Sequence, residues 1–155
     1  MKQRGKHILS LAKRIISLLK PYCKKIQLVG SIRRGEKNPA DIDIVLIPKN
    51  KKKIEEILGK KGKKILGGEQ KVYFKIEGVD VELYYTFPRE WGSALLAYSS
   101  RRGSGIGLRI IARLKGFKLT QHGLFNRKTG KRIASKTEEG IYHALGRPWK
   151  KPEDR

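Results

Sequence analysis

Two short segments in which acidic and apolar residues alternate constrain the fold of this chain more than any other feature. They are Asp41-Ile42-Asp43-Ile44 and Val79-Asp80-Val81-Glu82-Leu83. Because successive side chains of a strand point to opposite faces, each segment is expected to be a strand with one apolar and one acidic face. Acids two positions apart on a strand lie about 6–7 Å apart. They can converge on one cation, and without a cation they repel each other.

If these two strands are neighbours, Asp41, Asp43 and Asp80 meet on one face of a sheet. Hard oxygen ligands in that number suit Mg²⁺, which keeps its other positions for water and phosphate oxygens. Two such ions about 3.5–4 Å apart can clamp an in-line phosphoryl displacement. A simpler interpretation is that the acids only mark the solvent face of a strand, and for a single Asp-x-Asp that is the commoner meaning.

A glycine-containing turn upstream of the first acidic strand favours a nucleotide site. Gly30-Ser31-Ile32-Arg33-Arg34-Gly35 follows an apolar strand and places Gly30 eleven residues before Asp41. Gly30 permits close backbone approach, and the Ser31 hydroxyl, nearby backbone N–H groups and Arg34 can hold a triphosphate. The turn alone is a weak signal. Combined with the spaced acids and the later Asp80, it is a strong one.

The first half of the chain has the pattern of a small α/β sheet. Apolar residues at helical spacing run to Leu19, and Pro21 ends that helix. Further elements are expected from alternation, apolar runs and glycine breaks. They are strands over 26–29, 41–47, 63–66, 71–76 and 79–85, and a helix over 51–58.

The second half has a different pattern, with the boundary near Phe87-Pro88-Arg89. Helices are expected over 90–98 and 108–115, separated by a Gly- and Arg-rich turn over 99–107. A hairpin is expected from 118–125 and 131–134, and a last helix from an N-cap at Thr137 to Leu145. The predicted fold class is therefore α+β, with units 1–87 and 88–155.

Charge and cysteine content limit the classes of function. The 155 residues carry 37 Lys and Arg against 14 Asp and Glu, a net charge of +23. Such a field attracts nucleic acid first and an anionic membrane second. No apolar run approaches the roughly 18–20 residues of a membrane-spanning helix. The single cysteine, Cys23, excludes an internal disulfide and a cysteine-based zinc site, so an intracellular location is expected.

The nucleotide-site residues, Gly30-Ser31-x-Arg33-Arg34-Gly35, Asp41-x-Asp43 and Asp80, resemble the nucleotidyltransferase superfamily built like DNA polymerase beta. The second half narrows the resemblance to family X DNA polymerases. Its matching segments are Trp91 to Ser100, Lys118 to Phe125, Thr137 to Tyr142 and Leu145 to Arg155. The resemblance covers the chain from about Lys6 onward. It implies a nucleotidyltransferase palm with a mixed sheet flanked by helices over 1–87, and a small α/β thumb over 88–155.

The resemblance also implies a role for each matching residue. Asp41 and Asp43 would ligate two Mg²⁺ ions, for which Mn²⁺ can substitute. Asp80 would bind the catalytic ion and accept the proton of the primer 3′-OH. The implied nucleotide contacts are Gly30, Ser31, Arg34, Tyr98 and Ser99. The implied DNA contacts are Arg109, Arg101, Arg102, Arg113 and Lys115.

The expected function is that of a DNA-directed DNA polymerase that fills short gaps during DNA repair. Its partners would be dNTP and gapped or primer–template DNA, with no membrane involved. The chain resembles the minimal palm-plus-thumb polymerases of some viruses, which lack a lyase domain, and would act as a monomer in cytoplasm or nucleoid. Two alternatives remain open. One is transfer to another acceptor, such as an RNA 3′ end, a small molecule, a protein or an untemplated DNA end. The other is an inert basic binding protein.

Two departures from the family pattern concern nucleotide selection. Gly105 stands four residues before Arg109, where the family usually has an asparagine that contacts the incoming base. Ala97 precedes Tyr98, where the family has an aromatic pair beside the sugar. We therefore expect lowered fidelity, and the sequence leaves the rejection of ribonucleotides open.

Overall fold

The computed structural model describes residues 2–155, which form two compact units. The first unit ends at Thr86 and the second begins at Phe87. Within the described residues, no helix is both long and apolar enough to cross a membrane.

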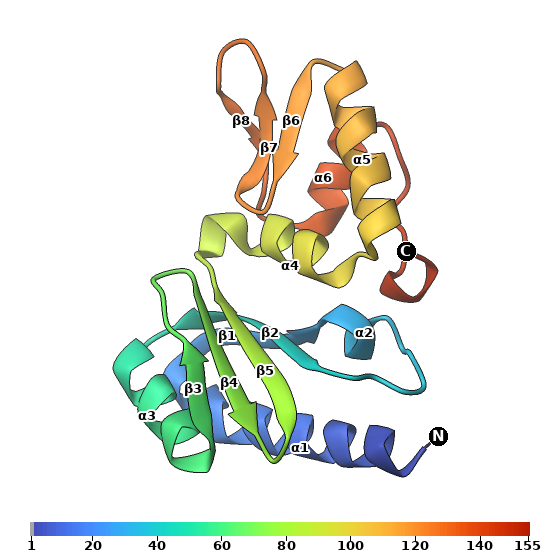
Figure 1. The fold of residues 1–155 in the computed structure, drawn as a ribbon. Coiled ribbons are helices and arrows are strands. Elements are labelled where there is room, and N and C mark those ends of the chain that lie inside the picture. Colours follow the sequence, from blue (N-terminus) through green and yellow to red (C-terminus); the bar gives the residue numbers. More distant parts are fainter. Residues whose placement is uncertain (1) are drawn as a thin grey trace. The chain divides into compact units, whose positions relative to one another are not determined.

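The first unit is a five-stranded mixed sheet with helices (Figure 1). The strand order is β1-β2-β5-β4-β3. Only the central pair, β2 with β5, is parallel, and the other neighbours are antiparallel. The elements are α1 (Gln3–Leu19), β1 (Cys23–Val29), α2 (Gly30–Arg33), β2 (Ile42–Pro48), α3 (Lys51–Lys61), β3 (Lys63–Leu66), β4 (Lys71–Ile76) and β5 (Val79–Tyr85). The predicted mixed sheet flanked by helices is confirmed.

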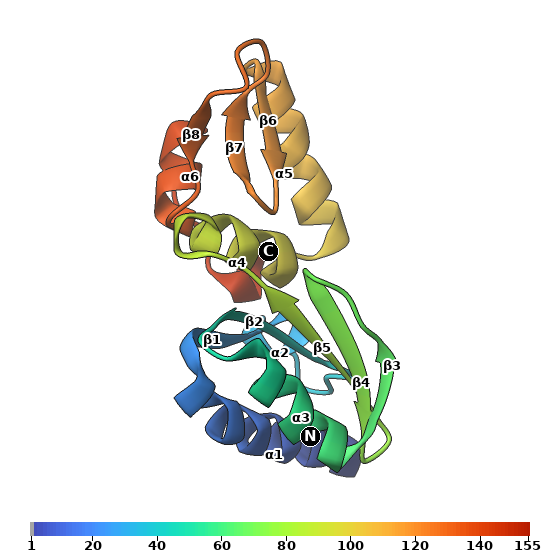
Figure 2. The ribbon, with the colours of Figure 1, turned by 90° about the vertical axis from the view of Figure 1, so that its left-hand side faces the viewer.

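One face of this sheet is buried by α1 and α3, which lie on the same side of it (Figure 2). Ile42, Ile44, Val81 and Leu83 are fully buried against these helices. The alternation predicted for β2 and β5 is therefore correct, and it leaves the acidic residues of both strands on the opposite face.

The second unit packs three helices around a three-stranded antiparallel sheet of order β6-β7-β8 (Figure 1). Its core joins Leu96, Ala112, Leu124 and Ile141, each from a different element. The elements are α4 (Trp91–Ser99), α5 (Arg102–Leu114), β6 (Phe117–Thr120), β7 (Gly123–Asn126), β8 (Arg132–Ala134) and α6 (Glu138–Ala144). Thr137 caps α6 as predicted, because its side chain accepts a hydrogen bond from the Gly140 N–H at 3.0 Å.

Two sequence-based predictions for this unit are wrong. Residues 102–107 are not a turn but the first half of α5, which begins six residues earlier than expected. Each glycine makes a helix about 1 kcal/mol less stable than alanine would. Packing of the rest of α5 into the core overrides that preference. The single strand predicted over 118–125 is two strands, β6 and β7, separated by Gln121 and His122.

Candidate active site

The register of β2 and β5 brings four carboxylates to one face of the first unit. Asp43 is the direct partner of Glu82, and the neighbouring pair is Ile42 with Val81. In a parallel pair, partnered side chains point to the same face. Asp41 and Asp80, each one residue before that neighbouring pair, therefore share the face of Asp43 and Glu82.

Asp43 and Glu82 form a crowded pair with excess negative charge. Burial, the charges of Glu82 and Asp41, and a hydrogen bond shared with Glu82 raise the pKa of Asp43 to about 7. The Tyr84 hydroxyl hydrogen-bonds to Glu82 and lies 3.5 Å from Asp43 Oδ1. Two carboxylates this close are stabilised by a shared proton or by a cation. The Lys71 Nζ lies 3.8 Å from Glu82 Oε2 and offsets part of this negative charge.

Asp41 and Asp80 differ from each other in how their charge is balanced. Burial, followed by the charges of Asp80 and Glu82, raises the pKa of Asp41. Asp80 instead has a lowered pKa, because it accepts a hydrogen bond from the Tyr73 hydroxyl and lies beside Lys75. The Lys75 Nζ is 3.3 Å from Asp80 Oδ1. The charge of Asp80 is thus compensated by the protein itself.

The four carboxylates have the donor chemistry that a hard divalent cation requires. Within residues 2–155, however, no three side chains of His, Cys, Asp or Glu are already gathered closely enough to hold one ion. The set instead consists of the pair Asp43 and Glu82, which Lys71 compensates only in part, flanked by Asp41 and Asp80. A cation bound by this set would remove the repulsion that raises the pKa of Asp43.

Glu82 is the member of this set that sequence reasoning did not select. The alternation of β5 already placed it on the acidic face, two residues after Asp80. The missing information was the register, which pairs Glu82 and not Asp80 with Asp43.

Gly30 lies directly against the carboxylate of Asp43. Its φ is +62°, in the left-handed region that favours glycine. A Cβ added at Gly30 would be 2.4 Å from Asp43 Oδ2. The end of β1 can therefore approach the carboxylate only because residue 30 has no side chain.

The predicted phosphate-binding residues follow Gly30 immediately, in α2 and its C-cap. Ser31 is half-buried, and its carbonyl accepts the Glu36 N–H at 3.1 Å. Arg34 is paired with Glu36, with its Nε 2.8 Å and its Nη2 2.6 Å from Glu36 Oε2. Arg34 would therefore have to exchange Glu36 for a phosphate in order to act as predicted.

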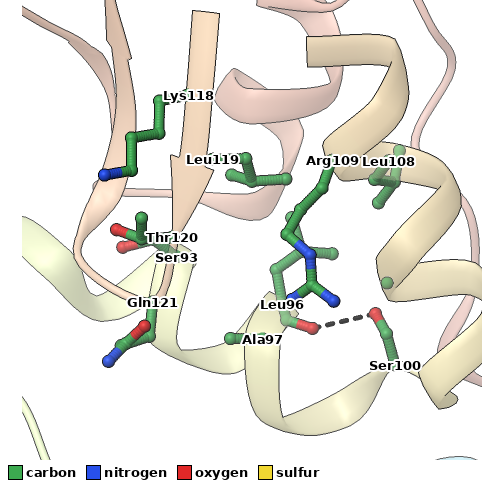
Figure 3. A pocket seen from close by; sticks show the side chains of 11 residues that line it. Ser93, Leu96, Ala97, Ser100, Leu108, Arg109, Lys118, Leu119, Thr120 and Gln121 are labelled. Carbon is green, nitrogen blue, oxygen red and sulfur yellow. Dashed lines mark hydrogen bonds between the residues drawn. The ribbon is translucent and has the colours of Figure 1, made fainter. Parts of the chain in front are cut away.

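The second unit has its own pocket of about 320 Å³ between α4, α5 and β6. Its lining includes Arg109 and Lys118 as well as Ala97 and Gly105. Figure 3 shows the Arg109 side chain reaching toward Ser100, whose hydroxyl donates to the Leu96 carbonyl at 2.8 Å. A Cβ added at Gly105 would meet nothing within 4 Å, so this wall of the pocket is open.

The remaining predicted contact residues are distributed around this pocket unequally. Tyr98 is half-buried, and burial raises its pKa. Ser99 is fully buried. The other predicted DNA contacts are exposed at the two ends of α5, which are about 18 Å apart at 1.5 Å per residue. Arg101 and Arg102 lie at its beginning, and Arg113 and Lys115 lie at its end.

Comparison with known proteins gives matches for both halves of the chain. Residues 95–155 match the family model of the DNA polymerase beta thumb. The chain is similar to the protein named Repair DNA polymerase X of African swine fever virus, isolate Warthog/Namibia/Wart80/1980, with 29% identity over 89% of this chain and 85% of that protein. The same identity and coverage apply to the protein of the Badajoz 1971 Vero-adapted strain.

Proposed function

We propose that this chain is a family X DNA polymerase that transfers a nucleotide from a dNTP to the 3′-OH of a primer strand in gapped DNA, because residues 95–155 match the DNA polymerase beta thumb and most of the chain is similar to Repair DNA polymerase X. The proposal rests above all on the pair Asp43 and Glu82, which Lys71 compensates only in part and which lies against Gly30. Carboxylates arranged in this way repel each other and gain nothing for folding, so a bound cation accounts for them best.

The metal ligands that we propose are Asp41 and Asp43 for two Mg²⁺ ions, completed by a carboxylate of β5. The resemblance assigns that third position to Asp80, and the register favours Glu82. When bound, the ions neutralise charge on the attacking and leaving oxygens of the phosphoryl displacement. Tyr84 orients Glu82 through its hydroxyl hydrogen bond.

The protein's own residues position the reactants in this scheme. Gly30 lets the β1 end approach the carboxylates, and Ser31 and Arg34 bind the triphosphate after Arg34 releases Glu36. The β5 carboxylate accepts the proton of the 3′-OH. Positioning and charge neutralisation of this kind account for most of the catalysis in phosphoryl transfer.

We propose that the pocket beside Arg109 receives the nascent base pair, with Tyr98 and Ser99 at the α4 end. Ala97 and Gly105 contribute no side chain beyond a methyl group there, which supports lowered selectivity for base and sugar. The basic residues at both ends of α5 bind phosphates of the DNA backbone. If six to ten phosphates are neutralised, affinity falls about 10³–10⁵-fold between 50 and 200 mM salt.

The acceptor can be identified by offering three substrates with Mg²⁺ and all four dNTPs or rNTPs. These are a one-nucleotide gapped duplex, a single-stranded DNA primer and an RNA primer. Templated insertion into the gap is the expected result. Equal, untemplated addition to the single strands would identify a terminal transferase, and extension of RNA alone would identify a different acceptor class.

We further propose that the protein acts as a monomer and that it acts inside the cell, where its DNA substrate is found. Sedimentation of the chain with and without a gapped duplex measures this directly. A mass of one chain per duplex is expected, and two chains per duplex would contradict it.

A further inference from the structure

A second pocket of the second unit is lined by α5 and by the segment that follows α6. Its volume is about 760 Å³. Ser104 and Gly107 form the α5 wall, and Trp149 lies opposite with 38% of its surface exposed. A Cβ added at Gly107 would meet nothing within 4 Å, so a flat group has room between the helix and the indole.

A buried guanidinium at the base of this pocket is incompletely satisfied. Arg155 lies near the rings of Tyr142 and Trp149, at 5.8 and 5.7 Å from their centres. Its Nη1 donates to Glu138 at 2.8 Å and its Nε to the Lys150 carbonyl at 2.9 Å. Its Nη2 is buried and has no acceptor within residues 2–155. The guanidinium thereby fixes Glu138 and the base of the pocket, and because it is buried it is not itself a contact for a molecule outside the chain.

The rim of the pocket is strongly basic. Arg147, Lys150 and Lys151 line it and are exposed, and Asp154 is the one acidic residue of the lining. The Trp149 ring is held in place, because its Nε1 donates to Glu138 Oε1 at 3.4 Å. An exposed, fixed aromatic ring among cations is the arrangement that binds single-stranded nucleic acid by stacking and phosphate contact.

We propose that this pocket binds a segment of single-stranded DNA, with one base against Trp149 and its phosphates on Lys150, Lys151 and Arg147. The site requires neither a metal ion nor a dNTP. It therefore goes beyond the polymerase function, and its binding can be measured without nucleotide transfer.

The sharpest test fills the pocket without changing any charge. Gly107→Leu places a side chain in the open space, and Gly103→Leu is the matched control, since it makes the same change in α5 outside the pocket lining. The probe is fluorescein-labelled octathymidylate, followed by anisotropy at low salt without Mg²⁺ or dNTP. Loss of one stacked base is worth about 1–3 kcal/mol, so Gly107→Leu should weaken binding about 5- to 150-fold, and Gly103→Leu less than about 2-fold. Equal affinities of the two variants would overturn the proposal.

A charge test uses two double variants of the same unit. Lys150→Gln with Lys151→Gln removes two cations of the pocket rim, and Lys128→Gln with Lys131→Gln removes two exposed cations of the β7–β8 turn. Each lost phosphate contact lowers the slope of log affinity against log salt by about 0.7 for a single strand. The slope should therefore fall by about 1.4 in the Lys150 and Lys151 double variant. It should not change in the Lys128 and Lys131 double variant. A similar loss in both would show diffuse attraction to a basic protein and would refute a defined site.

Discussion

Asp43 of β2 and Glu82 of β5 are direct partners in the one parallel strand pair of the sheet, and the Tyr84 hydroxyl contacts both carboxylates. Burial and the neighbouring negative charges raise the pKa of Asp43 to about 7. Asp80, two residues before Glu82, is balanced by Tyr73 and Lys75. The two acidic residues of β5 therefore have different electrostatic environments on the same face.

This difference predicts unequal effects of neutralising the two β5 acids. Glu82→Gln should lower nucleotide incorporation about 10²–10³-fold, as for the loss of one stabilising group in a transition state. Asp80→Asn should lower it less, because Lys75 at 3.3 Å and the Tyr73 hydroxyl compensate Asp80 more fully than Lys71 at 3.8 Å compensates Glu82. Single-turnover rates on a gapped duplex measure both. If Asp80→Asn lowered incorporation more than Glu82→Gln, the third ligand would be Asp80, the residue selected from the sequence.

Gly30→Ala is expected to abolish nucleotide incorporation while it lowers the stability of the fold only modestly. The new Cβ would collide with Asp43 Oδ2, whereas at Gly78, which has a similar φ of +76°, it would meet nothing within 4 Å. Both variants incur the cost of left-handed backbone, about 1 kcal/mol. Thermal unfolding should therefore shift in both, and incorporation should be lost only in Gly30→Ala. Equal activity in the two variants would contradict the close approach.

The Arg155–Glu138 ion pair should be a main stabiliser of the second unit. Both side chains are buried, with Arg155 Nη1 2.8 Å from Glu138 Oε2. Removing one partner of a buried pair costs about 3–5 kcal/mol, so Arg155→Ala should unfold at much lower denaturant concentration. The exposed pair Arg14–Glu77, at 3.1 Å, provides the control. Arg14→Gln should leave the denaturation midpoint almost unchanged, and comparable losses in both variants would show that burial is not the cause.

The thiol of Cys23 should react slowly in the folded protein. Burial raises the pKa of this thiol to about 11, well above its ordinary value. At pH 8 the raised pKa reduces the thiolate fraction about 100-fold. Ellman's reagent should thus react about 100-fold more slowly with folded than with unfolded chain. Because the pKa is raised, the associated stability is complete below pH 9 and is lost as the pH rises toward 11. Reaction at the unfolded rate would contradict the buried position.

The strands of the first unit were predictable because local pattern determines them. Val79–Tyr85 alternates along its length, and Gly67-Gly68 and Glu77-Gly78 separate it and its neighbours. The pairing of Asp43 with Glu82 could not be predicted in this way. It joins residues 39 positions apart, and alternation gives the face of each strand but not their register.

The second unit shows where local preference is overridden. Gly103, Gly105 and Gly107 indicated a turn, yet they lie in α5 because the packing of Leu108, Ile111 and Ala112 stabilises the whole helix. The turn between β6 and β7 has neither Gly nor Pro at its centre. It is stabilised instead by the Thr120 side chain, which accepts the His122 N–H at 3.1 Å.

Incorporation of one nucleotide into a gapped duplex by wild type and by Asp43→Asn is the most direct test of the proposed function. Asp43→Asn keeps the shape of the side chain beside Gly30 and removes the charge that a cation requires. The wild type should insert the templated nucleotide only with Mg²⁺ or Mn²⁺ present. Asp43→Asn should bind the duplex with unchanged affinity and insert nothing. Incorporation by Asp43→Asn at the wild-type rate would contradict the assignment of the carboxylates as the catalytic metal site.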